Sequence, residues 1–262
     1  MTELIVDGTP VATYVATPDV DIRLAPRPYL HPVRTLGGVV VTDEYPEDHP
    51  WHLGVSVTMQ DVDGINVWGG RTYVRDEGYI WRDDHGRVLS DGREPADGGF
   101  TETLRWCDGA DRTILRERRS VTARSAVRGW ELHFRYELAA PAQAEVTVGS
   151  PATNGRTGGA GYGGFFWRAT AGAAEAFVPS GGEAHGATDE WLAMTVGGAY
   201  TLVFRGLAGE DRWFARTGDY NGVCVAHAWE DTLTIKPGAP LTREISVLVA
   251  DGALSRAEIA AL

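Results

Sequence analysis

The chain has 262 residues and a formal net charge of -12, with 43% hydrophobic and 23% charged residues. These hydrophobic and charged fractions are those of an ordinary globular protein. The acidic balance argues against nucleic acid and against an anionic membrane surface as partners, since both require a basic face. No apolar run approaches the roughly 18 residues that a membrane-spanning helix needs, so we expect no membrane association.

The cysteine content and the first residues indicate a compartment. Cys107 and Cys224 are far apart and have no metal-type spacing. A secreted β protein would usually carry an even, patterned set of cysteines. The first seven residues form a strand-like run in place of a charged and apolar leader. We therefore expect a cytoplasmic protein with two reduced thiols.

Four of the seven histidines lie in the first third of the chain, in segments where a strand meets a turn. They are His31 within 27–34, His49 and His52 within 45–54, and His85 within 82–87. Histidine titrates near neutral pH, so it can act as a general acid or base with little tuning. Asp48, Asp83 and Asp84 adjoin these rings and could orient an imidazole, although a histidine beside a proline in a turn can also be a plain surface residue.

The segment around His52 predicts a strand with two different faces. Pro46 and Pro50 exclude a helix here, so His49 and His52 are not a helical ligand pair. Beyond them the pattern alternates between an apolar face, formed by Leu53, Val55, Val57 and Met59, and a face formed by His52, Gly54, Ser56 and Thr58. The small residues of the second face leave room for a ligand over His52.

The middle of the chain carries the clearest strand pattern. Residues 130–138 alternate between apolar and polar or charged side chains, and residues 112–123 resemble a partner strand. A hairpin turn over 126–129 would join the two. The glycine-rich stretch 154–164 then predicts a long, site-forming loop ahead of a buried strand at 165–167.

The C-terminal part indicates further strands and one helix. Strands are expected over 199–205, 222–229, 232–235 and 241–250, the last two separated by a Pro-Gly turn. Ser255 and Glu258 form a capping-box pattern ahead of a short C-terminal helix. The sequence thus predicts an all-β antiparallel sandwich of two packed sheets, a single domain over 1–262. Exposed edge strands would allow a homodimer.

Aromatic and arginine residues suggest a binding surface for sugars. Sugars present apolar C–H faces and a rim of hydroxyls, which suit aromatic platforms flanked by polar groups. The candidates are Trp51, Trp68, Tyr162, Arg168, Arg216 and Tyr220. For each tryptophan, packing in the core is the competing interpretation. A buried arginine such as Arg168 needs a partner, which a structural ion pair would supply as well as a substrate.

A bound metal is a further alternative. Three neutral imidazoles and a carboxylate would suit zinc, manganese or iron. The histidine spacing here matches no tight ligand pattern, so the cofactor stays unknown, with none or a divalent metal as the options.

Several of these segments together resemble a PmoA-like family of bacterial β proteins. The resemblance covers nearly the whole chain and lies in residues 27–32, 48–54, 63–68, 85–86, 161–164, 167–168 and 213–216. It implies a soluble β protein connected with sugar metabolism. That family often has a third histidine where this chain has Trp51, which weakens a three-histidine metal site and favours stacking. The strand ending at Gly238 is also similar to the last sheet of galactose-mutarotase-like supersandwiches, a likeness of fold only.

The leading hypothesis is a carbohydrate-active enzyme (an epimerase, lyase or hydrolase) that uses histidine acid–base catalysis. His49, His52 and His85 would be catalytic, and His31, Trp51, Trp68, Tyr162, Arg168, Arg216 and Tyr220 would bind a small carbohydrate. The alternatives are a non-catalytic sugar-binding subunit and a metal-dependent lyase or oxygenase.

Overall fold

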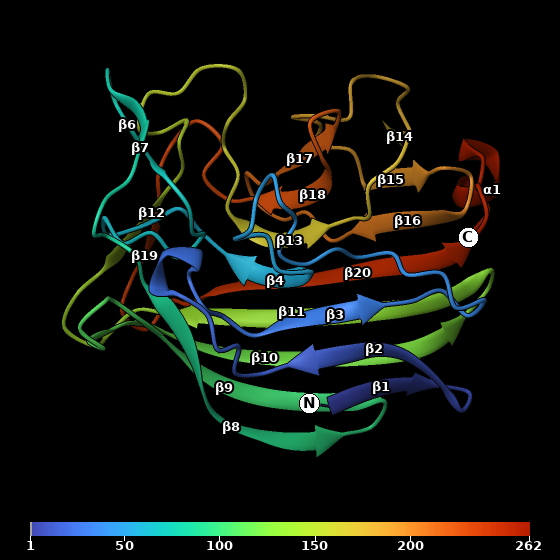
Figure 1. Cartoon of the computed structure of the whole chain (residues 1–262), viewed down its shortest axis with the longest axis horizontal. Helices are drawn as coiled ribbons and strands as arrows, with labels where there is room; N and C mark the ends of the chain where they lie inside the picture. The colour runs from blue at the N-terminus through green and yellow to red at the C-terminus, as the bar shows by residue number, and fades with distance from the viewer. Residues whose placement is uncertain (1) are drawn as a thin grey trace.

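The computed structural model describes residues 2–262, which form almost entirely antiparallel strands (Figure 1). One sheet has seven strands in the order β1 (Thr2–Val6), β2 (Thr9–Val15), β3 (Tyr29–Val33), β4 (Val55–Thr58), β13 (Gly164–Arg168), β18 (Asn221–Ala226) and β17 (Arg212–Thr217). A second sheet has eight, in the order β14 (Ala174–Phe177), β15 (Trp191–Val196), β16 (Tyr200–Arg205), β20 (Leu241–Asp251), β11 (Gly129–Ala139), β10 (Thr113–Ala126), β9 (Gly99–Cys107) and β8 (Arg87–Ala96). The predicted antiparallel all-β fold is confirmed.

Two small sheets and two short helical turns complete the structure. The small sheets are β19 (Leu233–Ile235), β12 (Val146–Gly149) and β5 (Asp61–Val62), and the hairpin of β6 (Thr72–Val74) and β7 (Gly78–Ile80). The helical turns are η1 (Ile22–Leu24) and α1 (Arg256–Ala260). In Figure 1 the β6–β7 hairpin, β12 and β19 lie at the left, at the opposite end from α1 and the C-terminus.

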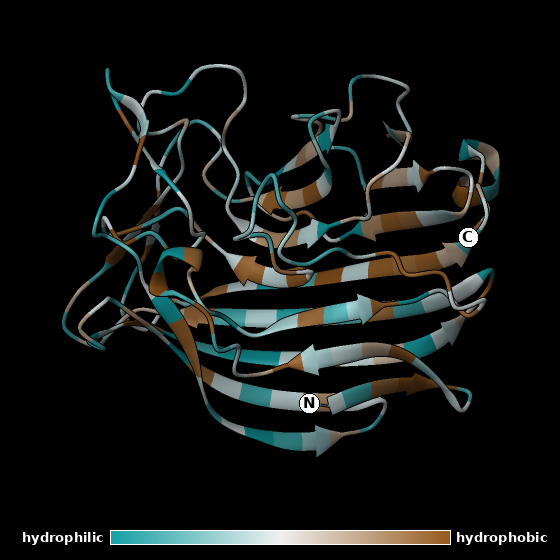
Figure 2. Ribbon diagram, viewed as in Figure 1, coloured by the Kyte–Doolittle hydropathy of each residue, from teal (hydrophilic) through white to brown (hydrophobic). Residues whose placement is uncertain are grey.

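The two large sheets pack against each other through aromatic side chains. Phe165 of β13 lies with its ring centroid 5.3 Å from that of Phe134 on β11, and Trp167 lies 5.7 Å from Phe204 on β16. All four side chains are buried in one hydrophobic cluster that draws on both sheets. The apolar and polar bands that alternate along many strands in Figure 2 are the pattern that such a sandwich requires.

The strongest strand predictions are confirmed. Trp130, Leu132, Phe134, Tyr136 and Leu138 are all fully buried. β10 and β11 pair from Arg116 and Ala139 to Ala126 and Gly129, and these last two residues flank the turn expected over 126–129. Alternation predicted these strands well because one face of each packs on the core.

The strand after His52 begins later than expected. β4 starts at Val55, and Gly54 has a positive φ of 40° that interrupts the extended backbone. A Cβ on Gly54 would come within 2.1 Å of the Leu30 carbonyl oxygen, so this bend requires glycine. The two faces are as predicted, since Val55, Val57 and Met59 belong to the core cluster.

The C-terminal predictions also hold. In α1 the Ser255 side chain accepts from the Glu258 backbone N–H, and the Glu258 carboxylate accepts from the Ser255 N–H. The Pro-Gly turn joins two strands of different sheets, since β19 pairs with β12 while β20 pairs with β11 and β16. Both cysteines are free and buried. Over residues 2–262, no helix has the length and apolar character needed to cross a membrane.

Candidate functional site

The candidate site lies on the face of the seven-stranded sheet that points away from the core. On β13, Phe165 and Trp167 belong to the main core, so Phe166 and Arg168 project from the opposite face. On β17 the same alternation places Phe214 and Arg216 outward. The outward side chains form a second apolar cluster that contains Trp68, Tyr162, Phe166, Phe214, Cys224 and Ala226. This cluster is the base on which polar groups gather.

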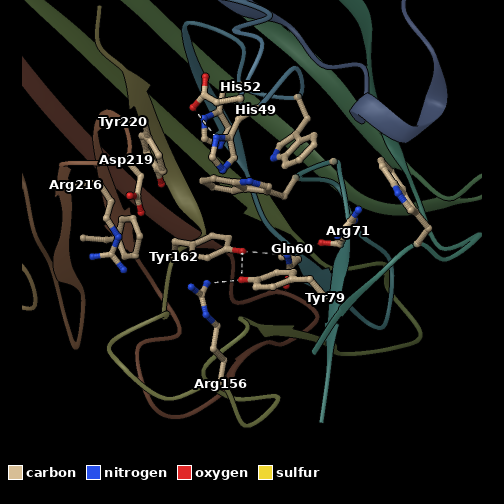
Figure 3. Close-up of a pocket in the computed structure, with 16 residues that line it drawn as sticks. His49, His52, Gln60, Arg71, Tyr79, Arg156, Tyr162, Arg216, Asp219 and Tyr220 are labelled. Atoms are coloured by element: carbon tan, nitrogen blue, oxygen red, sulfur yellow. Dashed lines mark hydrogen bonds and ion pairs between the residues drawn. The ribbon is translucent and has the colours of Figure 1, made fainter. Parts of the chain in front are cut away.

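A cavity of about 490 Å³ opens over this cluster (Figure 3). Its volume suits a small-molecule ligand. The residues that line it are Asp48, His49, Trp51, His52, Gln60, Trp68, Gly69, Arg71, Tyr79, Trp81, Arg156, Tyr162, Phe214, Arg216, Asp219 and Tyr220. They come from β7, β17 and the loops around β4, β5 and β13, so distant parts of the chain share one cavity.

At one side of the cavity, His49 forms a dyad with Asp48. Asp48 Oδ2 accepts a hydrogen bond from His49 Nδ1 at 2.7 Å, which leaves Nε2 as the acceptor nitrogen of a neutral ring. Arg168 holds Asp48 with three hydrogen bonds of 3.1–3.3 Å. Burial acts to raise the pKa of Asp48, but the His49 hydrogen bond and the Arg168 charge outweigh it and lower that pKa. A carboxylate that orients an imidazole in this way is typical of general-base sites.

His52 lies directly behind His49 and differs from it in chemistry. The two rings stack with centroids 4.7 Å apart and an angle of 11° between their planes. His52 is only 1% exposed, and burial, together with the charges of His49, Arg168 and Arg27, lowers its pKa well below the usual value. Its Nδ1 accepts from Arg168 Nη1 at 3.2 Å, so the ring proton lies on Nε2. His52 can therefore donate a hydrogen bond but is a poor base.

Two tryptophans of the wall are fixed by one buried arginine. Arg27 donates to the backbone carbonyls of Trp51 and Trp68 at 2.9 and 3.2 Å, and also to Ser56 Oγ at 3.1 Å. Its burial lowers its pKa to about 9, so the guanidinium remains charged at neutral pH. Arg27 thus joins the loop before β4 to the loop after β5.

The Trp51 ring also rests against a glycine pair. Gly69 and Gly70 have φ values of 96° and 70°, and a Cβ on Gly70 would lie 2.5 Å from the Trp51 ring. Only glycine allows both this backbone and this contact. Trp81 meets Trp51 edge to face, with centroids 6.4 Å apart, and remains 51% exposed at the rim of the cavity.

A chain of hydrogen bonds runs along another wall (Figure 3). Gln60 Nε2 donates to the Arg71 carbonyl at 3.2 Å and to the Tyr162 hydroxyl at 3.1 Å. Tyr162 in turn lies 2.9 Å from the Tyr79 hydroxyl, to which Arg156 also donates. Burial raises the pKa values of Tyr79 and Tyr162, so both remain protonated.

The cavity brings together seven of the ten predicted site residues. They are His49, His52, Trp51, Trp68, Tyr162, Arg216 and Tyr220. Arg168 lies behind the wall, where it holds Asp48 and packs its guanidinium 4.8 Å from the Tyr220 ring. It is a positioning residue, and its buried charge has the ion-pair partner that the sequence required.

The other two predicted histidines do not line the cavity. His85 Nε2 donates to the Gly70 carbonyl at 2.7 Å, so this buried ring supports the glycine pair beneath Trp51. His31 lies beside β4 with its ring between Thr42 Oγ1 at 3.0 Å and Glu44 Oε1 at 3.4 Å. The cavity therefore does not include His85, predicted to be catalytic, or His31, predicted to bind the sugar, and both rings make contacts within the protein instead.

Sequence reasoning missed several residues of the cavity. They are Gln60 just before β5, Arg71 and Trp81 on either side of the β6–β7 hairpin, Tyr79 on β7 and Arg156 in the glycine-rich loop. Phe214 and Asp219 are sequence neighbours of the predicted Arg216 and Tyr220. The glycine-rich loop was expected to form part of a site, and it contributes Arg156 together with the predicted Tyr162.

The structure offers no set of metal ligands within residues 2–262. No three or more His, Cys, Asp or Glu side chains there are arranged to hold a metal ion. His49 and His52 stack face to face, which does not point two ring nitrogens at one ion.

Comparison with known proteins places the chain in a family. The model described as "Family of unknown function (DUF6807)" matches residues 1–262, so the chain belongs to this family. No curated protein matches the sequence. Among solved structures, the heparan sulfate lyase HepC of Pedobacter heparinus and a mutant of it are similar at 10% identity and a TM-score of 0.31. The similarity covers 64% of this chain and spans only 22% of theirs, too distant to bear on the site.

Proposed function

For this member of DUF6807 we propose a carbohydrate-active enzyme in which His49 removes a proton from a carbon of the bound sugar. The observation that carries the proposal is the Asp48–His49 dyad at the wall of an aromatic cavity. His49 Nε2 has no hydrogen-bond partner among the described residues, and the side chain is 31% exposed. A substrate in the cavity could therefore reach this nitrogen.

The aromatic walls support a sugar as the substrate. Trp51, Trp68, Trp81 and Tyr220 offer ring faces and edges to apolar C–H groups. Gln60, Tyr79 and Asp219 lie among them as partners for hydroxyl groups. This mixture of apolar walls and a few polar groups is typical of sites that fix the orientation of a polar ligand.

The carboxylates of the cavity favour proton abstraction over glycoside hydrolysis. Hydrolysis by the common mechanisms uses two carboxyl groups, one on each side of the scissile bond. Asp48 and Asp219 are the carboxylates that line the cavity, and Asp48 is already bound by His49 and Arg168. Only Asp219 remains free to face a substrate, so an imidazole base is the better candidate.

The step follows from the positions of the two rings. His49 Nε2 takes the proton, and the electron pair of the C–H bond stays on the substrate carbon. Return of a proton to the other face of that carbon gives an epimer. Alternatively, loss of a neighbouring oxygen substituent with its bonding electrons gives an alkene. His52 Nε2–H is a neutral donor beside this reaction.

Deuterium exchange detects the proton-abstraction step whichever product forms. Sugars and sugar acids are incubated with the enzyme in D₂O, and NMR follows both solvent deuterium in recovered substrate and the appearance of product. We expect a substrate to exchange or react, and His49→Ala to slow this by about 10²–10⁴-fold, the usual contribution of a general base.

His133→Ala is the matched control. His133 is also half-buried and pairs with a nearby carboxylate, with Nε2 2.9 Å from Glu131 Oε2, but it lies on β11 in the other sheet. This variant should retain full activity. Equal activity in His49→Ala and His133→Ala would refute the role of His49, and sugar binding without exchange or product would favour a non-catalytic binding protein.

A further inference from the structure

Three arginines line the cavity without a carboxylate partner among residues 2–262. Arg71 follows the glycine pair, Arg156 belongs to the glycine-rich loop, and Arg216 lies on β17. No carboxylate oxygen of the described chain lies within 4.0 Å of any of their nitrogens, whereas Arg168 just behind the wall forms an ion pair with Asp48. Two carboxylates also line the cavity, Asp48, which pairs with Arg168, and Asp219, so the three arginines still leave an excess of positive charge there in a protein of net charge -12.

Two of these arginines are held by neutral groups, which fix their position and leave their charge uncompensated. Arg156 donates to the Tyr79 hydroxyl, and its Cζ lies 4.9 Å from the Tyr79 ring centroid. Arg216 packs on Phe214 with its Cζ 4.3 Å from the ring centroid, and its Nη1 lies 3.2 Å from His185 Nδ1. Burial and the Arg216 charge lower the pKa of His185, so this ring stays neutral and accepts.

Unused hydrogen-bonding capacity in the same wall also indicates a ligand. Tyr79 accepts from Arg156, the Tyr162 hydroxyl accepts from Gln60, and the two hydroxyls lie 2.9 Å apart, so that one of them donates to the other. This bond uses one of the two phenolic protons, and the other is free for another acceptor. Gln60 is 2% exposed, and its Oε1 is buried without a partner because Nε2 must face the Arg71 carbonyl. A buried oxygen of this kind needs a donor, which a sugar hydroxyl supplies.

We infer that the substrate is a sugar acid, whose carboxylate is bound by this arginine group. Guanidinium forks match a carboxylate in two parallel hydrogen bonds. The inference rests on the proposed function and explains it, because a C–H bond next to a carboxylate yields its proton only when nearby cations neutralise the charge that develops. The Tyr79 hydroxyl and Gln60 Oε1 then contact the hydroxyl rim.

Calorimetry with matched pairs of sugars tests the inference. The probes are D-glucuronate and D-galacturonate, compared with D-glucose, D-galactose and the methyl esters of the two acids, all at low ionic strength. Each acid should bind at least about tenfold more tightly than its neutral counterparts, the typical effect of one charged hydrogen bond. Raising the salt concentration should reduce this preference.

Variants that remove the arginine charges test whether the arginines cause the preference for acids over neutral sugars. Arg156→Gln and Arg216→Gln should each weaken binding of the acids by about tenfold or more and change binding of the neutral sugars little. Arg118→Gln is the control, since Arg118 is exposed on β10 in the other sheet and has no ion pair. If either of these half-buried arginines proves necessary for folding, Arg71→Gln serves in its place, because Arg71 is exposed and its replacement should change stability little.

Several results would overturn the inference. These are equal affinity for acids and neutral sugars, absence of acid binding up to about 10 mM, undiminished acid binding in all three variants, or tighter binding of glucose 6-phosphate or glucose 6-sulfate than of either acid. Failure of the proposed function can be distinguished from failure of this inference. If the acids bind through the arginines but exchange no deuterium, the proposed enzymatic activity is wrong and the inferred carboxylate site stands. If only neutral sugars exchange deuterium, the activity stands and the inference of a sugar-acid substrate is wrong.

Discussion

At the scale of single residues, two adjacent histidines with similar sequence surroundings perform different tasks because their environments differ. His49 has a carboxylate on Nδ1 and an open Nε2, whereas His52 is buried and receives a hydrogen bond from a cation. The guanidinium of Arg168 bonds to both Asp48 and His52, so one arginine sets the tautomers of both rings. Burial and charge, which the sequence does not display, decide which ring can act as the base.

The low pKa of His52 predicts a pH-dependent stability. Above pH 6.5 the ring is neutral in both the folded and the unfolded chain, so it contributes no slope. Below pH 6.5 the His52 ring becomes protonated in the unfolded chain but stays neutral in the folded chain. The free energy of unfolding therefore falls as the pH falls. One such ring contributes at most about 1.4 kcal/mol per pH unit.

Urea denaturation at pH 7.0, 6.0 and 5.0 measures this slope. The pKa values of His31 and His185 are also lowered, first of all by burial, and they add to the decline in the native protein. His52→Gln should lose less stability between pH 6.0 and 5.0 than the native protein does. Parallel stability curves for the two proteins would contradict the low pKa of His52.

At the scale of elements, the cavity depends on loops that are tied to one another by buried polar groups. Arg27 is fully buried and donates five hydrogen bonds, four of them to backbone carbonyls from three loop segments. Its role is to hold the walls of the cavity in place, a task that no local pattern could reveal.

Replacing Arg27 by methionine should therefore destabilise the fold and loosen the site. The variant leaves buried carbonyl groups without donors, and we expect a loss of about 3–5 kcal/mol in the free energy of unfolding. The measurement is urea denaturation followed by tryptophan fluorescence, with Arg118→Met as the control that removes an exposed arginine. A loss below about 1 kcal/mol in Arg27→Met would show that water replaces the guanidinium without difficulty.

The β6–β7 hairpin illustrates what sequence patterns miss at this scale. Tyr79 and Trp81 lie at its end and immediately after it, and both reach the cavity. The hairpin has only three residues in each strand, none of them buried, so no hydrophobic alternation marks it. By contrast, residues 130–138 were predictable because every second side chain is buried in the core.

At the scale of the whole molecule, the sequence predicted the architecture better than the site. The sandwich follows from alternation, turns and a scarcity of helix signals, all of which are local. Which loops meet over the outer face of β13, β17 and β18 depends on the order of strands in the sheet, which is a long-range property. His85 illustrates the difference, since it follows an aspartate just as His49 does, but it faces the Gly70 carbonyl from the far side of the loop.

The two faces of the seven-stranded sheet have different roles, one in the core and one at the cavity. The inner face contributes Phe165, Trp167 and Trp213 to the core that holds the two large sheets together. The outer face contributes Phe166 to the apolar cluster beneath the cavity and Phe214 and Arg216 to the cavity lining. Substitutions on the outer face can therefore alter binding with little effect on the packing between the sheets.

A crystal structure of the protein with D-glucuronate bound tests the central claim most directly. We expect the sugar to occupy the cavity over Phe166 and Phe214, with its carboxylate on one or more of Arg71, Arg156 and Arg216. We also expect a ring carbon within reach of His49 Nε2. A sugar bound elsewhere on the molecule, or one in the cavity with its carboxylate turned away from all three arginines, would contradict the account.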